Sequence, residues 1–347
     1  MINYLSLFTG IGAFEKAMKN LGIPFNLVGF SEIEENAVKS YCAIHNVDES
    51  LNLGDITKID EKTLPQIDFC TYGFPCQDIA ICGKMQGLFN DDGTKTRSGL
   101  FFDALRIIEH TRPKVAIAEN VKNLLSPKFN AQFQVILASL EYAGYNNYFA
   151  VLNAKDYGIP QNRERVFIVS IRKDVDTLTF DFPKGIELKR CMLDFLEADV
   201  DPKYYLSNKM FAYVLDLEEK QKGTKWEGRA NSDYINPKIA HTLSVRGIKG
   251  QRAGVSNIIC TSTTSPIKVS EYKKGLNGRR NNVDLRNLTE RECFRLMGFS
   301  DYDFDKIKDS FRQTALYTMA GNSIVVNVAE ALLKQIFRKG GVFNAIQ

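Results

Sequence analysis

Short apolar runs alternate with helical patterns through the first half of the chain, and this alternation constrains the fold more than any other feature. The apolar runs predict strands at residues 4–8, 26–30, 67–72, 115–118 and 165–171. Helical periodicity predicts helices that end near residue 21 or cover residues 34–45, 100–110 and 131–143. Such alternation is typical of a mostly parallel sheet with helices on both faces. We therefore expect an α/β, doubly wound fold.

The pattern changes after Phe182-Pro183. Residues 184–290 are richer in Gly, Asn, Lys and Arg and only weakly periodic, and helical periodicity returns over residues 322–337. A chain of 347 residues suits two domains. We predict a catalytic domain at 1–183 plus 306–347, and a second, smaller domain at 184–305.

The composition is that of an ordinary soluble protein, with 44% hydrophobic and 25% charged residues. No apolar stretch approaches the roughly 18 residues of a membrane span, and no signal peptide is evident. We therefore expect a cytoplasmic protein with no membrane partner. Seven scattered cysteines indicate free thiols in a reducing compartment. With three histidines and no Cys/His cluster, we expect no metal site.

Positive charge is concentrated in one segment, although the net charge is only +4. Between Gln221 and Arg280 there are twelve Lys/Arg and three Asp/Glu. This charge alone is consistent with a solvated basic face or with a polyanion contact, in which clustered cations release counterions from phosphates.

A glycine turn, Phe8-Thr9-Gly10-Ile11-Gly12, joins the first strand to the first helix. Glu32 follows the second strand, where an acid can bind ribose hydroxyls, and Asp55 lies where an acid could meet an adenine edge. These features indicate a nucleoside cofactor but do not separate NAD from S-adenosylmethionine. Glu15 occupies the place of the third glycine in a dinucleotide motif, which argues against a dinucleotide.

A cysteine loop, residues 73–77, follows a buried strand. Cys76 in this tight Gly/Pro loop could point into the ligand crevice as a nucleophile, although a lone cysteine is more often a small buried hydrophobe. Glu119 ends the next core strand, where a carboxylate could protonate a ring nitrogen. Arg163 and Arg165 alternate on one face of a late strand, as a charge pair or as a clamp for phosphate or a carbonyl oxygen that lowers the thiol pKa.

These motifs, in this order, resemble the C5 cytosine-specific DNA methyltransferase family. The resemblance covers about two thirds of the chain, except the basic middle segment. It rests on Phe8–Gly12, Gly73–Gln77, Glu119-Asn120-Val121, Gln161–Arg165, Arg291–Phe299 and Gly321-Asn322-Ser323.

The resemblance implies an S-adenosylmethionine-dependent methyltransferase fold and a role for each catalytic residue. Cys76 would add to carbon 6 of cytosine, Glu119 would contact N3 and the exocyclic amine, and Arg163 and Arg165 would hold the base oxygen or a nearby phosphate. The predicted S-adenosylmethionine site comprises Phe8, Thr9, Gly10, Ile11, Gly12, Glu32, Ile33, Asp55, Ile56, Gly73, Pro75, Leu100, Asn322 and Ser323.

The resemblance also implies duplex DNA as the partner, with the target base flipped out of the helix at about a few kcal/mol. We expect the loop Asp78–Gly99 to close over the DNA, and residues 184–290 to read its sequence. The predicted DNA contacts are Gln77, Lys84, Arg97, Thr242, Arg246, Lys249 and Arg252. Asp78-Ile79-Ala80 and Cys82 depart from the family pattern, which puts loop closure in doubt more than chemistry.

Three alternatives stay open at this point. The first is an enzyme of the same fold that acts on tRNA, against which the long basic insert argues. The second is a dinucleotide-dependent oxidoreductase with a reactive cysteine. The third is a non-catalytic DNA-binding protein, against which the intact Cys76, Glu119 and Arg165 argue. A monomer is expected because flipping one base needs one active site; a companion restriction endonuclease is an open alternative.

Overall fold

Contacts in the computed structural model, which describes residues 1–80, 86–176, 180–216, 223, 234–243, 257–278, 281–338 and 340–343, divide the chain into two compact units. Unit 1 comprises Met1–Asn153, Glu164–Gly185 and Val326–Gln347, and unit 2 comprises Ala154–Arg163 and Ile186–Val325. Packing thus places residues 154–163 and 306–325 in unit 2, whereas the predicted catalytic domain included them. The assignment of catalysis and DNA reading to the two parts stays a prediction.

Unit 1 is built on a six-stranded sheet of order β2-β1-β3-β4-β7-β5. Its strands are β1 (Ile2–Leu7), β2 (Phe25–Ser31), β3 (Phe69–Tyr72), β4 (Val115–Val121), β5 (Tyr145–Asn153) and β7 (Glu164–Arg172). The pairs β1–β2, β1–β3 and β3–β4 are parallel, whereas β7 runs antiparallel to both β4 and β5. The carboxyl ends of β1 to β4 therefore meet at one edge, where α/β proteins bind ligands.

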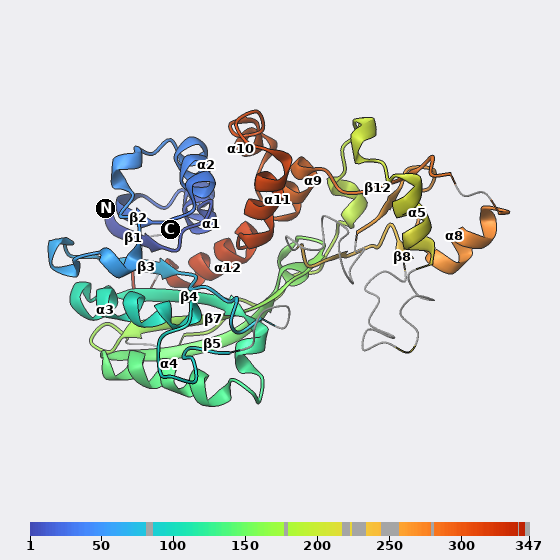
Figure 1. Cartoon of the computed structure of the whole chain (residues 1–347). Coiled ribbons are helices and arrows are strands. Elements are labelled where there is room, and N and C mark those ends of the chain that lie inside the picture. The colour runs from blue at the N-terminus through green and yellow to red at the C-terminus, as the bar shows by residue number, and fades with distance from the viewer. Residues whose placement is uncertain are drawn as a thin grey trace. The chain divides into compact units, whose positions relative to one another are not determined.

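Helices cover both faces of this sheet (Figure 1), so the predicted doubly wound α/β fold is confirmed. On one face lie α3 (Phe101–Thr111) and α4 (Asn130–Tyr142); on the other lie α1 (Ala13–Asn20) and α12 (Val326–Ile336), which contact each other. Helix α2 (Glu35–His45) follows β2.

Alternation along the strands assigns side chains to these two faces. Leu5 and Leu7 of β1 belong to the large core cluster that includes buried residues of α3 and α4. Tyr4 is also fully buried, and its hydroxyl donates to Glu15 of α1 at 3.3 Å. The sheet is therefore buried on both sides, as continuous apolar strands predict.

Unit 2 has only two-residue strands in its described part and a smaller core. Its strands are β6 (Gln161–Asn162), β8 (Tyr234–Ile235), β9 (Ala240–His241), β10 (Ile259–Cys260), β11 (Ile267–Lys268) and β12 (Leu285–Arg286). Its helices are α5 (Asn208–Leu215), α8 (Val269–Gly275), α9 (Glu290–Leu296), α10 (Asp301–Asp305) and α11 (Gln313–Asn322). A cluster around Phe211, Ile258 and Leu285 forms a core between α5, α8 and the β10–β12 pair.

The helix predicted at 322–337 begins later than expected. Asn322 ends α11, and α12 starts only at Val326. The combined stretch Gln313–Ile336 is long and apolar enough to cross a membrane by length and composition, but 67% of its apolar window is buried inside the protein. Buried core helices give the same signal, so this stretch is weak evidence for a membrane span.

Candidate active site

Cys76 lies in a loop whose backbone is held at three successive carbonyls. Asn120 Nδ2 donates to the carbonyl of Phe74 at 3.0 Å, and Ser98 Oγ donates to that of Pro75 at 2.6 Å. The carbonyl of Cys76 accepts the amides of residues 79 and 80, at 3.0 and 2.7 Å. The thiol belongs to a half-buried residue at the carboxyl end of β3. A loop fixed in this way presents the sulfur in a defined place, as a nucleophile requires.

Glu119 stands at the neighbouring strand end, beside the start of this loop. It follows Ala118 of β4, which pairs with Tyr72 of β3. A Cβ added to Gly73 would lie 3.6 Å from Glu119 Oε2, so the carboxylate approaches the loop closely. Arg165 Nε lies 3.0 Å from Glu119 Oε1, and the two side chains are only 18% and 14% exposed. The predicted grouping of Glu119 with Arg165 near the cysteine loop is therefore observed within unit 1.

Arg163 differs from its prediction, because it shares neither a strand nor a unit with Arg165. It follows β6 in unit 2, whereas Arg165 lies on β7 in unit 1. Arg163 is 4% exposed, and its guanidinium donates to the carbonyls of Leu243, Gly321 and Ser323 at 3.0, 2.9 and 2.7 Å. The prediction that the two arginines share one face of a strand is therefore wrong. The observed partners of Arg163 are backbone carbonyls.

The glycine turn lies at the carboxyl ends of β1 and β2. Its backbone has positive φ at Phe8, Gly10 and Gly12, of 54°, 58° and 76°. Glu32 reaches the turn with one carboxylate oxygen, which accepts the amide of Gly10 at 2.9 Å. Its other oxygen accepts the amides of Ile33 and Glu34. The predicted acid therefore sits directly against the turn.

Asn52 completes this edge, and sequence reasoning missed it. Its side chain accepts the amides of Glu32 and Gly54 at 3.2 and 3.1 Å and donates to the carbonyl of Glu32 at 3.1 Å. It thereby fixes the predicted ribose acid relative to the segment that carries Asp55. Only its position just before a Gly-Asp pair could have drawn attention to it.

Asp55 begins a short helical turn, Ile56–Lys58. Hydrogen bonds from Thr57, both hydroxyl and amide, hold the pKa of the Asp55 carboxyl below its ordinary value. Ile33 leaves 72% of its surface exposed, which is unusual for an isoleucine next to a polar loop. Together with Glu32, these residues offer two carboxylates that accept hydrogen bonds and one apolar contact, a combination that suits an adenosine.

The remaining predicted cofactor residues fall into two groups. The following belong to unit 1, in loops after β1 and β3, in the helical turn Ile56–Lys58 or at the start of α3: Thr9, Ile11, Ile56, Gly73, Pro75 and Leu100. Asn322 and Ser323 belong to unit 2, at the end of α11.

Asp78, which departs from the family pattern, anchors the segment that follows the cysteine loop. It is 2% exposed, and its carboxylate accepts the amide of Arg97 at 3.0 Å. Arg97 Nη2 also lies 3.6 Å from Asp78 Oδ1, and the Asp78 carbonyl accepts the amide of Gly87 at 2.8 Å. Arg97 is therefore engaged with an acid here, although more than half of its side chain is exposed.

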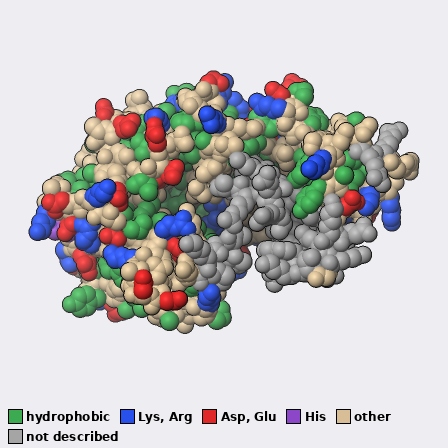
Figure 2. Space-filling model, viewed as in Figure 1, with side chains coloured by type: hydrophobic (Ala, Val, Ile, Leu, Met, Phe, Trp, Pro, Cys, Tyr) green, Lys and Arg blue, Asp and Glu red, His purple; other side chains and the backbone are tan. Residues whose placement is uncertain are grey.

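The other predicted DNA contacts are only partly described. Gln77 is exposed, and Thr242 Oγ1 donates to the carbonyl of Asn162 at 2.6 Å. Lys84, Arg246, Lys249 and Arg252 lie outside the described residues. On the face drawn in Figure 2, acidic and basic side chains are interspersed wherever the chain is described. The contact between the basic segment and DNA therefore stays a prediction.

No group of three or more His, Cys, Asp or Glu in the described ranges is placed to hold a metal ion. The six cysteines within those ranges, of seven in the chain, are free thiols.

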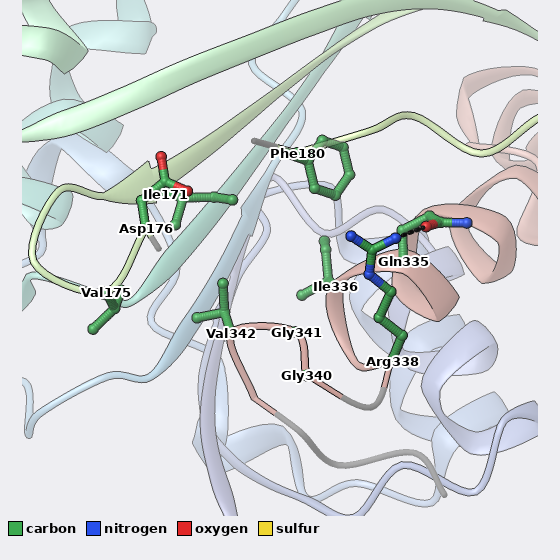
Figure 3. A pocket seen from close by; sticks show the side chains of 10 residues that line it. All are labelled: Ile171, Val175, Asp176, Phe180, Gln335, Ile336, Arg338, Gly340, Gly341 and Val342. Atoms are coloured by element: carbon green, nitrogen blue, oxygen red, sulfur yellow. Dashed lines mark hydrogen bonds between the residues drawn. The ribbon is translucent and has the colours of Figure 1, made fainter. Parts of the chain in front are cut away.

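Figure 3 shows a pocket in unit 1. It is lined in part by Ile171, Asp176, Ile336 and Arg338. Ile171 pairs with Val115 at the opposite end of the β4–β7 ladder from Arg165. This pocket therefore takes no part in the site described above.

Comparisons with known proteins identify the family of the chain. Residues 2–338 match the family described as C-5 cytosine-specific DNA methylase. The chain is 34% identical to "Type II methyltransferase M2.ScrFI" of Lactococcus lactis subsp. cremoris, over 97% of this chain and 99% of that protein. It is 32% identical to "Orphan methyltransferase M.SPRI" of Bacillus phage SPR, over 96% and 97%. The structure of S. pombe Dnmt2 methyltransferase matches with a TM-score of 0.70 at 20% identity, over 97% of this chain and 98% of that one.

Proposed function

The chain belongs to the C-5 cytosine-specific DNA methylase family, and from this premise we propose how its own residues methylate cytosine. It is a DNA (cytosine-5-)-methyltransferase, which replaces the alternatives of a tRNA enzyme, an oxidoreductase and a non-catalytic DNA-binding protein. Each step of that reaction can be assigned to individual side chains.

The Cys76 sulfur, as thiolate, forms a bond to carbon 6 of a flipped-out cytosine. The electron pair of the C5–C6 double bond then makes carbon 5 nucleophilic. Glu119 contacts N3 and donates a proton or hydrogen bond there, which stabilises the charge that the addition places on the ring. After methylation at carbon 5, a water removes the proton from carbon 5 and the electron pair of that bond re-forms the C5–C6 double bond as the carbon–sulfur bond breaks. Cys76 leaves as thiolate, and N3 returns any proton it received to Glu119.

One observation carries this proposal: the cysteine loop and the Glu119–Arg165 pair adjoin each other. Glu119 Oε2 lies 3.6 Å from the place of a Gly73 Cβ, three residues before the nucleophile. Arg165, at 3.0 Å from the other carboxylate oxygen, orients Glu119. This pairing supports Arg165 as the arginine of the site, whereas the buried carbonyl partners of Arg163 support a positioning role for that residue.

S-adenosylmethionine, when bound, supplies the methyl group, and the residues present fit it. The turn Phe8–Gly12 has the open backbone that lets a ligand approach, because a Cβ on Gly10 would meet nothing within 4 Å. Glu32 would bind the ribose hydroxyls, Asp55 the adenine edge, and the exposed Ile33 the adenine face. Asn322 and Ser323 remain proposed contacts from unit 2.

Duplex DNA is the substrate of this reaction, and we assign its contacts first to the segment around Cys76. Gln77 and Arg97 are both exposed and lie within the segment from Cys76 to the start of α3. Thr242 and the basic residues Lys84, Arg246, Lys249 and Arg252 are proposed to hold phosphates or read bases. One active site suffices for one base, so a monomer is proposed.

A covalent trap tests the central step. DNA in which 5-fluorocytosine replaces cytosine has no removable proton at carbon 5, so the enzyme stays attached once methyl transfer has occurred. We expect the wild type, with S-adenosylmethionine, to form a denaturation-resistant complex in which a peptide containing Cys76 carries the nucleotide. Cys76→Ser should form none and should transfer no tritiated methyl group to ordinary DNA.

Cys191→Ser is the matched control, because Cys191 is also half-buried and its amide, which serine keeps, donates to the Asp194 carboxylate at 2.7 Å. It should behave like the wild type. A complex formed by Cys76→Ser, or attachment through another cysteine, would overturn the proposal.

A further inference from the structure

The two glycines of the turn Phe8–Gly12 face different neighbours. A Cβ built on Gly10 meets nothing within 4 Å, so this glycine leaves room on the open side of the turn. A Cβ built on Gly12 would lie 2.3 Å from His45 Nε2 and 2.7 Å from Tyr41 Cε2. Position 12 therefore requires glycine for two reasons: its φ is 76°, and a side chain there would clash with helix α2.

His45, the last residue of α2, uses this close approach to bind the turn. Its Nε2 lies 2.9 Å from the carbonyl oxygen of Ile11. A carbonyl can only accept, so the hydrogen must be on Nε2. Glu32, just before α2, accepts the amide of Gly10 at 2.9 Å. The turn is thus held on both sides by side chains that flank one helix.

His45 is itself held in place by contacts with two helices. The ring of Tyr41, one turn earlier on α2, packs against it with centroids 4.8 Å apart. The Tyr41 hydroxyl donates to Glu15 of α1 at 3.1 Å, and Lys19 Nζ donates to the His45 carbonyl at 2.6 Å. With 4% of its surface exposed, the imidazole is a rigid support rather than a surface group.

We propose that His45 is a positioning residue for the cofactor: by holding the Ile11 carbonyl, it keeps the turn in the conformation that binds S-adenosylmethionine. This inference rests on the proposed cofactor site. The turn needs such support because three of its five residues have positive φ, and one of them, Phe8, is not a glycine. Without the bond the turn populates other conformations, and the apparent Kd rises by the inverse of the fraction that remains competent.

Binding of S-adenosylhomocysteine to the full chain, measured by calorimetry, tests this without any catalytic step. His45→Met keeps the size of the side chain but removes the donor, and we expect the Kd to rise about tenfold, the loss of one buried hydrogen bond. His45→Gln places an amide nitrogen near the position of Nε2 and should restore most of the affinity. His110→Met, at an exposed histidine of α3, is the matched control and should bind like the wild type.

Steady-state kinetics separate positioning from general damage. His45→Met should raise KM for S-adenosylmethionine while kcat and KM for DNA stay near wild-type values. If His45→Met does not fold, Gly12→Ala provides the second variant, because its methyl group displaces His45. It should raise the Kd for S-adenosylhomocysteine by at least the same factor.

Two results would overturn the inference: wild-type affinity in His45→Met, or affinity in His45→Gln as low as in His45→Met. Glu32→Ala distinguishes an error in the role of His45 from an error in the proposed cofactor site. If Glu32→Ala weakens binding and His45→Met does not, only the role of His45 is wrong. If neither does, the proposed cofactor site is wrong as well.

Discussion

Unit 1 and unit 2 bury their polar side chains in different ways. In unit 1, Glu15 is 1% exposed and accepts hydrogen bonds from the hydroxyls of Tyr4 and Tyr41. In unit 2, Arg286 and Glu292, exposed by 2% and 0%, form a two-pronged ion pair at 2.9 and 2.8 Å. Unit 2 also contains Arg163, whose guanidinium donates hydrogen bonds to three backbone carbonyls.

The difference follows from how each backbone is satisfied. The six strands of unit 1 pair their own amides and carbonyls, and Arg165 on β7 pairs through Nε with Glu119 at 3.0 Å while its Nη1 donates to the carbonyl of Glu164 at 2.8 Å. The described strands of unit 2 are two residues long, and buried backbone groups there need side-chain partners. Two arginines two positions apart in sequence therefore do different work, because the chain passes from one unit to the other between them.

The largest expected effect is a fall in the rate of methyl transfer, with the fold of unit 1 intact. Glu119→Gln keeps the shape of the side chain but cannot transfer a proton, so we expect the single-turnover rate of methyl transfer to fall about a thousandfold, within the range of general acid catalysis. DNA binding, measured by fluorescence anisotropy, and the melting temperature should stay near wild-type values.

Glu164→Gln is the matched control for this variant. Glu164 begins β7, next to Arg165, and its partner is Lys122 in a pair whose side chains are 42% and 56% exposed. Loss of an exposed pair costs little, so the rate and stability should be unchanged. Equal rates for Glu119→Gln and the wild type would reject the proposed role of Glu119.

The next effect should appear in unit 2 as lost stability. Arg163→Met leaves the carbonyls of Leu243, Gly321 and Ser323 without this donor, and a buried unsatisfied carbonyl costs about 1–3 kcal/mol. We expect the free energy of unfolding of unit 2 to fall by about 3 kcal/mol or more. Hydrogen exchange with mass spectrometry should locate the change in residues 240–243 and 313–325.

Arg165→Met is the counterpart that sharpens the comparison. It should slow methyl transfer and leave hydrogen exchange in unit 2 unchanged. If Arg163→Met instead kept wild-type stability and slowed catalysis as Arg165→Met does, Arg163 would contact the base or a phosphate as the sequence first suggested, and the contrast between the two arginines would be lost.

Sequence patterns predicted unit 1 well because its signals are local. Apolar runs gave β1, β2, β3, β4 and β7 within a few residues, and the acid after β2 was found by its distance from the glycine turn. They missed β5, whose Asn146 and Asn147 weaken the apolar pattern; Asn147 Oδ1 accepts the Ser170 hydroxyl and Asn146 bonds Asp176.

Long-range bonds from side chains to backbone are invisible to such patterns. Asn120 was recognised only as part of a motif, although it holds the Phe74 carbonyl across 46 positions. Ser98 holds Pro75 across 23 positions, and Arg163 reaches Ser323 across 160. Sequence periodicity contains no information about such pairs. The candidate residues could therefore be named from the sequence, but the separate role of each could not.

The smallest expected effect concerns Glu15, the buried acid of unit 1. Burial raises the pKa of its carboxyl above the ordinary value of 4.5, although hydrogen bonds from Ser6, Tyr41 and Tyr4 oppose the shift. The protonated form is thus favoured in the folded state. Its contribution to stability is complete below the ordinary pKa and is lost as pH rises through the raised one.

Glu15→Gln cannot ionise, so its stability should lack this fall. Between pH 5 and 8, we expect the wild type to lose on the order of 1 kcal/mol relative to Glu15→Gln, measured by hydrogen exchange of amides in β1 and α1. Glu109→Gln, at an exposed position of α3, should follow the wild type. Parallel pH curves for Glu15→Gln and the wild type would mean that Glu15 is ionised in the folded protein over this pH range, and burial would then not decide the protonation of this acid.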